Sequence, residues 1–337
     1  MEFYNSFEYI KHVTAMTKPA LRYDASEDLT AWQKRAREKL YELLGLPFEK
    51  CDDLFRIVGE TNKDTHREIE FVFQSEKDYF VQGTFCVPHT EEKLPVVICL
   101  LGHATGKHIA LGNAKYPGDA ELIASGRDLA VRAVREGYCS VVIEWRYMGE
   151  AGRFEADGAP LCCRKNAALP SLLLGRSAIG ERVWDVQRLI DGIEKYFTEY
   201  ADTSKIMCMG HSGGGTVCFY SSCVDERIRL SMPSGSFCSF DESIIPIHHC
   251  CCNYVPGIRK YFDMGDMAML IAPRPFIPVC GVNDNDFPVQ GVEHSFGEVR
   301  TLYESIGKGD VCRLVRGNAG HQFYPDDAWP VAHQLFD

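Results

Sequence analysis

Apolar residues follow two different spacings along this chain, and the change comes near residue 95. Before it, apolar and polar residues alternate over residues 68–73 and again over residues 79–87, which is the period of a half-buried β-strand. The two segments lie close together in the chain, so we predict that they pair as antiparallel strands.

An amphipathic helix is predicted ahead of these strands, over residues 30–44. Trp32, Ala36 and Leu40 fall on one of its faces, and Gly45 followed by Pro47 ends the helical pattern. We therefore expect residues 1–50 to form an N-terminal helical arm and residues 51–337 to form the main domain. The arm either mediates association with a second copy of the chain or packs on its own core.

After residue 95, short and nearly continuous apolar runs alternate with amphipathic segments. Such runs are typical of parallel strands that are buried on both faces and connected by helices. The predicted strands are 96–101, 140–145, 205–209, 228–232, 276–280 and 311–315. The predicted helices between them include 127–136, 182–197 and 292–306. This alternation predicts an α/β fold with a doubly wound, mostly parallel sheet, preceded by the antiparallel pair.

Two connections, 146–181 and 233–270, are much longer than the usual few residues. In open α/β sheets, ligands bind beyond the carboxyl ends of the strands, where such connections begin. We expect these two long loops to shape the ligand site.

The charge and composition of the chain argue against some classes of binding partner. The chain has 337 residues, of which 45% are apolar and 25% charged, and its formal charge at pH 7 is −11. An acidic balance with no evident basic surface argues against nucleic acid or an anionic membrane as partner. No window approaches the length of a membrane span, and the first residues lack the apolar stretch of a signal peptide.

The fifteen cysteines are many for a chain that shows no export signal. Their number is odd, and Cys99, Cys208, Cys280 and Cys312 lie inside predicted core strands, where cysteine behaves as a small apolar residue. The pattern favours reduced thiols in a cytoplasmic protein over a framework of disulfides.

Ser212 stands between a predicted buried strand and a helix, inside Gly210-His211-Ser212-Gly213-Gly214. This is the G-x-S-x-G pattern of a nucleophile elbow, in which a sharp turn exposes the serine hydroxyl and glycines avoid clashes of β-carbons. The same turn aims the first N–H groups of the helix at the reacting centre. The alternative to a nucleophile elbow is a glycine-rich helix N-terminus that binds phosphate or simply packs tightly.

A serine hydroxyl needs a base to take its proton and a third group to orient the base. The expected chain order is serine, acid, histidine. Asp284 follows the predicted strand 276–280, and His321 follows the last predicted strand. Asp286 competes with Asp284 for the role of the acid, and we favour Asp284 because it is the first carboxylate after the strand.

The loop after the first parallel strand, LLGHATGKH at residues 100–108, should supply the second N–H of an oxyanion hole. The main-chain amide of His103 or Ala104 is the expected donor, together with that of Gly213. The loop also looks like a phosphate loop, but its spacing is one residue short and it lacks the Ser or Thr that binds Mg²⁺.

The run His248-His249-Cys250-Cys251-Cys252 raises the question of a metal site. Residues adjacent in a chain do not easily converge on one tetrahedral ion, and no second pair stands at zinc spacing. We therefore expect no metal and no cofactor, and we expect this segment to line the mouth of the pocket or to pack beneath the long loop.

Taken together, these stretches resemble an α/β-hydrolase family of acetyl xylan esterase-like enzymes, near the dienelactone-hydrolase-like enzymes. The resemblance spans residues 50–337 and rests on the loop at 102–103, on 172–191, on MGHSGGG at 209–215, and on 253–276, 281–288 and 319–323. It implies an α/β-hydrolase fold and a serine esterase, with Ser212 as nucleophile, Asp284 as acid and His321 as base. Dienelactone hydrolases proper use cysteine as the nucleophile, so Ser212 points away from their chemistry.

Two departures from that family bear on the substrate. Many members read His-Gly where this chain has Leu101-Gly102, which changes the polarity of the pocket but leaves a backbone donor in place. Many members are exported and act on plant polysaccharides, whereas a chain without a signal peptide suits a small acylated molecule or an imported oligosaccharide. The alternatives are a serine peptidase of the prolyl-oligopeptidase type and a non-catalytic binding module on the same fold.

Overall fold

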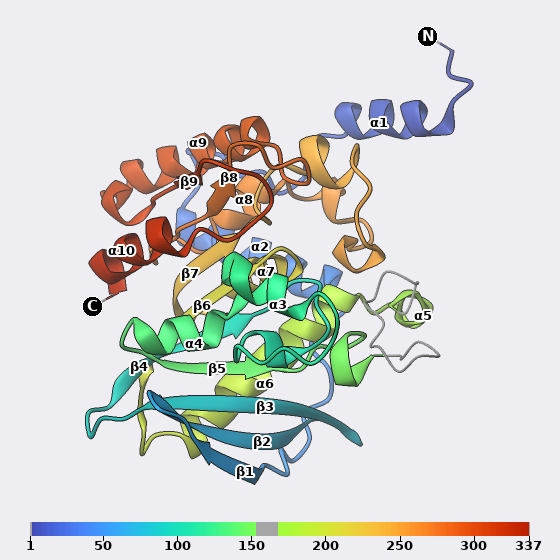
Figure 1. The fold of residues 1–337 in the computed structure, drawn as a ribbon. Helices are drawn as coiled ribbons and strands as arrows, with labels where there is room; N and C mark the ends of the chain where they lie inside the picture. The colour runs from blue at the N-terminus through green and yellow to red at the C-terminus, as the bar shows by residue number, and fades with distance from the viewer. Residues whose placement is uncertain (1, 153–167, 337) are drawn as a thin grey trace.

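A nine-stranded sheet runs through the computed structural model, which describes residues 2–152 and 168–336 (Figure 1). The strand order is β1-β2-β3-β5-β4-β6-β7-β8-β9. The strands are β1 (Arg56–Asn62), β2 (His66–Glu76), β3 (Tyr79–Pro88), β4 (Leu94–Leu100), β5 (Cys139–Ile143), β6 (Ala201–His211), β7 (Ile228–Ser234), β8 (Val279–Gly281) and β9 (Val315–Gly317). From β5 to β9 all neighbours are parallel, so the predicted doubly wound sheet is confirmed.

The predicted antiparallel pair is also confirmed, because β2 and β3 pair with Ile69 opposite Phe85 and Phe71 opposite Gly83. Strand β3 then pairs antiparallel with β5 and joins this unit to the parallel sheet. Strand β1, which extends the pair by one strand, was not predicted. Six of its seven residues are exposed, so it lacks the apolar alternation that identifies a half-buried strand.

Helices cover both faces of the sheet (Figure 1). Along β4, Val96, Ile98 and Leu100 face one apolar core, whereas Val97 and Cys99 face the other. The first core is closed by α2 (Leu29–Leu43), α6 (Ala178–Tyr196), α7 (Gly213–Val224), α8 (Met264–Ala268) and α9 (Val289–Ser305). The second core is closed by α4 (Leu129–Arg135) and α10 (Pro325–Phe336). Both faces of β4 are therefore buried, as its continuous apolar sequence requires.

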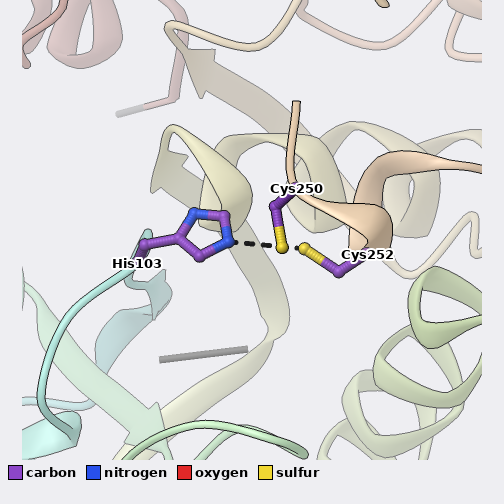
Figure 2. Close-up of side chains that lie close together, drawn as sticks. All are labelled: His103, Cys250 and Cys252. Carbon is purple, nitrogen blue, oxygen red and sulfur yellow. Dashed lines mark hydrogen bonds between the residues drawn. The ribbon is translucent and has the colours of Figure 1, made fainter. Parts of the chain in front are cut away.

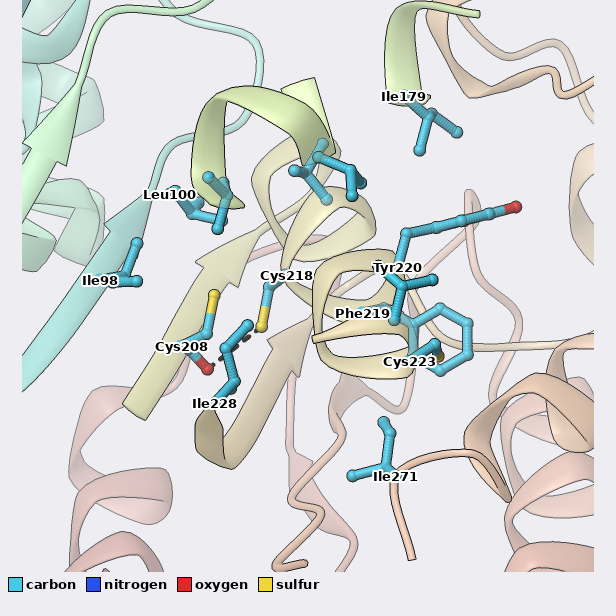
Figure 3. Packing of buried hydrophobic residues seen from close by; sticks show 14 of the residues in the cluster. Ile98, Leu100, Ile179, Cys208, Cys218, Phe219, Tyr220, Cys223, Ile228 and Ile271 are labelled. Carbon is cyan, nitrogen blue, oxygen red and sulfur yellow. Dashed lines mark hydrogen bonds between the residues drawn. The ribbon is translucent and has the colours of Figure 1, made fainter. Parts of the chain in front are cut away.

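The core around α7 holds in place the turn that precedes it (Figure 3). Cys218, Phe219 and Tyr220 of this helix are buried, and the Cys218 thiol donates to the main-chain oxygen of Cys208 on β6 at 3.1 Å. The described cysteines are thiols, and those predicted in the core are buried. Burial raises the pKa of the Cys99 thiol well above its ordinary value, which keeps it protonated and inert.

The N-terminal segment has two helices that differ in their packing. Helix α2 buries Trp32, Ala36 and Leu40 in the first core, whereas α1 (Ser6–Met16) buries no residue. The division at residue 50 stays a prediction. Within residues 2–152 and 168–336, no helix combines the length and apolar character needed to cross a membrane.

The last two predicted strands, 276–280 and 311–315, are wrong in their bounds. Residues 309–311 form a 3₁₀ turn, and the regular strands begin only at Val279 in β8 and Val315 in β9. Between Phe276 and Val279, the ladder is interrupted because Pro278 has no N–H to donate, although its carbonyl accepts from Val315 at 3.0 Å. The apolar pattern of these segments is unaffected by this interruption, so periodicity alone places the strands too early.

The two long connections contain short helical turns. Residues 233–270 hold three such turns and α8, whereas the described part of 146–181 holds one turn, α5 (Leu169–Leu172) and the start of α6. Residues 153–167 of the second connection lie outside the described residues. Both connections leave the carboxyl ends of strands.

Candidate active site

Ser212 occupies the turn between β6 and α7 in a backbone conformation that side chains rarely adopt, with φ 55° and ψ −124°. For a residue with a β-carbon, such a conformation costs about 1–3 kcal/mol and persists only where the surrounding structure enforces it. Here the N–H of Ser212 donates to Ser234 O on β7 at 2.8 Å, and Ser212 O accepts from the N–H of Thr216 in α7 at 2.9 Å. Strained backbone held in this way is the signature of a nucleophile elbow.

Two glycines of the G-x-S-x-G pattern are required by close contacts with β4. A β-carbon at Gly214 would lie 2.0 Å from the main-chain oxygen of Leu100 in β4, and one at Gly210 would lie 2.7 Å from the same oxygen. Neither position has room for a side chain, because the atoms in the way belong to backbone. The glycines therefore let α7 start directly against the sheet and turn the serine outward.

His321 links Ser212 to Asp284 in one hydrogen-bonded chain. Its Nε2 lies 2.8 Å from Ser212 Oγ, and its Nδ1 lies 2.8 Å from Asp284 Oδ2. The three residues come from the loops after β6, β8 and β9, which end on the same edge of the sheet. A serine hydroxyl, an imidazole and a carboxylate at these separations form the arrangement that activates a serine nucleophile.

The two candidate acids are held differently. The Asp284 side chain is 1% exposed, and its Oδ1 accepts from the N–H groups of Asp286 at 2.8 Å and Phe287 at 3.0 Å. The Asp286 side chain is 51% exposed, and its Oδ2 lies 3.9 Å from His321 Nε2, the nitrogen that faces Ser212. The geometry therefore favours Asp284 as the partner that orients His321, and Asp286 as a residue of the pocket wall.

His211, which precedes the serine, lies under the site as a neutral ring. It is fully buried, and its ring centroid is 4.8 Å from that of His321. Burial lowers the pKa of His211 well below its ordinary value, and the nearby His321 and Arg127 lower it further. His211 therefore adds no second positive charge next to the imidazole that would accept a proton.

The loop at residues 100–108 passes directly beside the serine. A β-carbon at Gly102 would lie 2.8 Å from His211 O and 2.9 Å from the β-carbon of Ser212. His103 follows in the pocket wall, with its ring close to Gly213, and Ala104 is the next residue. The loop predicted to supply an oxyanion donor is thus in contact with the nucleophile turn, and the choice between His103 and Ala104 stays a prediction.

A cavity of about 620 Å³ opens onto Ser212 and is large enough for a small-molecule substrate. The connection 233–270 supplies much of its wall, so the expectation that the His248–Cys252 run lies at the pocket is met for four of its five residues. The described part of 146–181 contributes none of the lining. The lining residues are His103, Arg127, Ser212, Gly213, His248, His249, Cys250, Cys251, Asn253, Tyr254, Asp286, Phe287 and His321.

Arg127 is a pocket residue that the sequence analysis placed only at the start of a helix. Its guanidinium donates to the main-chain oxygen of His103 at 3.2 Å, and no carboxylate among residues 2–152 and 168–336 is paired with it. Burial lowers the pKa of Arg127 from its ordinary value, but a guanidinium remains charged at neutral pH. The pocket of this acidic protein therefore contains a half-buried positive charge beside the serine.

Glu144 supports the far end of the loop at residues 100–108. It follows β5, is 3% exposed, and its Oε2 accepts from the N–H of Lys107 at 3.2 Å. Burial raises the pKa of Glu144 to about 7 from its ordinary value of 4.5. The folded protein therefore favours the protonated carboxyl, and the resulting contribution to stability is fully present below pH 4.5 and is lost as the pH rises through 7.

The Glu144→Gln variant is expected to be more stable than the wild type at pH 8.5 and similar to it near pH 5. Glutamine keeps an acceptor for the Lys107 N–H without a buried charge, and the gain at high pH is at most about 3 kcal/mol. Thermal unfolding at both pH values measures the effect, with Glu91→Gln, a change at an exposed carboxylate ahead of β4, as the control. The same stability difference at both pH values would contradict a buried, titrating Glu144.

Comparison with known proteins identifies relatives over nearly the whole chain. The model of the Abhydrolase family matches residues 3–299. Among curated proteins, the "Putative hydrolase YtaP" of Bacillus subtilis (strain 168) is 29% identical over 292 residues, which cover 81% of this chain and 93% of that protein. The resemblance inferred from the motifs is thereby confirmed at the level of the family.

Solved structures share the fold at low sequence identity. A "putative acetyl xylan esterase" from Bacteroides fragilis NCTC 9343 superposes with a TM-score of 0.78 at 18% identity, covering 94% of this chain and 83% of its own. A glucuronoyl esterase from Solibacter usitatus superposes with a TM-score of 0.71 at 15% identity, covering 95% of this chain and 97% of its own. These likenesses establish the α/β-hydrolase fold.

Proposed function

Because the chain belongs to the Abhydrolase family, we propose that it hydrolyses carboxylic esters with Ser212 as nucleophile, His321 as base and Asp284 as orienting acid. The observation that carries the proposal is the unbroken chain of two 2.8 Å hydrogen bonds through His321, which ends on a serine in a strained turn. The serine faces a cavity of sufficient size, so its hydroxyl is accessible to a substrate.

In the first half of the reaction, Ser212 Oγ attacks the acyl carbonyl as His321 Nε2 takes its proton. Asp284 accepts from Nδ1–H, which holds the imidazole in the tautomer whose Nε2 is free to act as base, and it stabilises the imidazolium that forms. The negative charge that develops on the carbonyl oxygen is stabilised by the amides of Gly213 and of His103 or Ala104.

The imidazolium then gives its proton to the departing alcohol, and an ester between Ser212 and the acyl group remains. In the second half, His321 takes a proton from water, which attacks the acyl carbonyl, and Ser212 leaves with the proton returned by His321. The carboxylic acid is released and the serine is regenerated. These steps use only groups of this chain and water.

The proposed substrates are small acylated molecules or carbohydrate esters. Support comes from the structural neighbours, which are described as an acetyl xylan esterase and a glucuronoyl esterase. A cavity of about 620 Å³ suits a substrate of one or two sugar units. The charge of Arg127 at the cavity wall favours a substrate that carries a carboxylate close to the scissile ester.

The proposal is tested by assaying the wild-type protein with p-nitrophenyl acetate, p-nitrophenyl butyrate and an aminoacyl-proline p-nitroanilide. We expect turnover of both esters, faster for acetate, and none of the anilide. An acetylated uronic acid should have a lower KM than the matched acetylated neutral sugar. A fluorophosphonate probe should label Ser212, which peptide mass spectrometry locates.

Three other outcomes of these assays would change the proposal in different ways. Cleavage of the anilide without cleavage of esters would make the protein a peptidase of the prolyl-oligopeptidase type. Absence of any turnover together with no labelling of Ser212 in folded protein would make it a non-catalytic module. Equal KM values for the acidic and neutral sugars would remove the proposed role of Arg127 and leave the esterase proposal intact.

A further inference from the structure

Three side chains with strong metal-binding atoms meet at the wall of the cavity (Figure 2). His103 comes from the loop after β4, whereas Cys250 and Cys252 come from the long connection after β7. The imidazole nitrogen and the two thiol sulfurs all lie within 4.8 Å of one another. The run His248–Cys252 contains only two members of this cluster, and the third, His103, lies about 150 residues earlier in the chain.

The separations suit a tetrahedral ion. Zinc binds Cys sulfur at about 2.3 Å and His nitrogen at about 2.0 Å, so a tetrahedral angle places a nitrogen and a sulfur ligand about 3.5 Å apart and two sulfurs about 3.8 Å apart. In the structure, His103 Nε2 lies 3.4 Å from Cys252 Sγ. One edge of the tetrahedron therefore has nearly its expected length, and the other two separations, both within 4.8 Å, exceed theirs by at most about 1.3 Å.

The local backbone explains how two cysteines of a C-x-C sequence reach the same point. Residues Cys251–Asn253 form a 3₁₀ turn, and Cys250 precedes it in an extended conformation. This bend turns Cys250 and Cys252 toward His103, and the cluster leaves out Cys251. Adjacent residues do not easily form a metal site by themselves. Here the turn brings two cysteines of the run together with a distant histidine, so their closeness in the sequence does not prevent the three side chains from binding one ion.

We propose that His103, Cys250 and Cys252 bind a soft divalent ion of the zinc class at the wall of the cavity. Thiolate and imidazole ligands select zinc over magnesium or calcium, and two thiolates neutralise the charge of the ion. Three protein ligands leave a fourth position for water. His103 and Cys250 line the cavity, which supplies the path of entry, whereas Cys252 is 2% exposed.

A bound ion would connect two segments that shape the proposed active site. His103 belongs to the loop expected to supply an oxyanion donor, and Cys250 and Cys252 belong to the connection that supplies much of the cavity wall. Metal binding therefore fixes the loop at residues 100–108 against the 248–252 segment. The proposed metal site is separate from Ser212, His321 and Asp284, and it does not depend on the proposed hydrolysis.

The test is a titration of the full-length, metal-free chain with Co²⁺ under a phosphine reductant, which keeps the thiols reduced. Co²⁺ reports its ligands through a thiolate-to-metal charge-transfer band and through the intense visible bands of tetrahedral coordination. We expect both to saturate at one ion per chain and Zn²⁺ to displace the cobalt. Cys250→Ser, Cys252→Ser and His103→Ala should each weaken binding about tenfold or more.

Cys251→Ser is the matched control, because it changes a neighbouring cysteine that lies outside the cluster. It should bind Co²⁺ like the wild type, with the same charge-transfer band. Thermal unfolding of each metal-free variant shows that binding is not lost through misfolding. Absence of a charge-transfer band at one equivalent in the wild type, or equal binding by Cys251→Ser and the three ligand variants, would overturn the proposal.

Discussion

The Ser212→Ala variant is expected to hydrolyse p-nitrophenyl acetate with a kcat about 10⁴- to 10⁶-fold below that of the wild type. Alanine removes the only atom that can form the acyl-enzyme bond, while the cavity and the oxyanion donors remain. KM should change little, because the lost interaction is one made in the transition state. Steady-state kinetics of the two proteins side by side, with the uncatalysed rate subtracted, measures the loss.

The control for this experiment is Ser221→Ala. Ser221 lies on α7, the helix that begins after the nucleophile, and it is fully buried and away from the cavity. Its replacement should leave kcat within a fewfold of the wild type. Alanine at position 212 keeps the same strained backbone as serine, so thermal unfolding of Ser212→Ala should match that of the wild type. Residual activity near the wild-type level in Ser212→Ala would place the nucleophile elsewhere.

The second large effect is expected for Asp284→Asn, which should lower kcat about 10⁴-fold. Asparagine still accepts from the N–H groups of Asp286 and Phe287 through its carbonyl oxygen, but its NH₂ group faces His321 Nδ1. The imidazole then carries its proton on Nε2 and can no longer accept one from Ser212. The charge that stabilises the imidazolium is lost as well.

Asp286→Asn is the matched comparison, because the same change is made two residues away on an exposed side chain. We expect a loss of less than about tenfold in kcat, since Asp286 does not hold Nδ1 of His321. The kcat and its pH profile should be measured for both variants. A larger loss in Asp286→Asn than in Asp284→Asn would transfer the role of the acid to Asp286.

The sequence by itself was sufficient for features that depend on neighbours in the chain. The period of apolar residues identified β2, β3 and the parallel strands from β4 to β7. A strand buried on one face has alternating apolar residues, and a strand buried on both faces has a continuous apolar run. The glycines at 210 and 214 marked the nucleophile turn, since only residues without a side chain fit between β4 and α7. The order of Ser212, Asp284 and His321 followed from the same local pattern of strand and loop.

Other features were decided only by the tertiary structure. The bounds of β8 and β9 depend on the pairing between these two segments, in which the Val315 N–H donates to the Pro278 carbonyl and Phe276 forms only isolated bridges. The sequence already favoured Asp284 over Asp286 as the acid, but the contact of Asp284 with His321 Nδ1 is visible only in the folded chain. In each case the deciding contact joins segments far apart in the chain, and periodicity holds no information about them.

The same reason explains why the sequence did not reveal the positive charge and the proposed metal ligands at the cavity. His103 and Arg127 lie 24 residues apart in the connection between β4 and β5, Cys252 lies in the connection after β7, and each has an ordinary local pattern. They meet because β4 lies between β5 and β6 in the sheet, with β7 next to β6, so that their connections end above the same edge. Local sequence determined the elements and the nucleophile turn, whereas the strand order, set by non-local hydrogen bonds and packing, determined which side chains share the site.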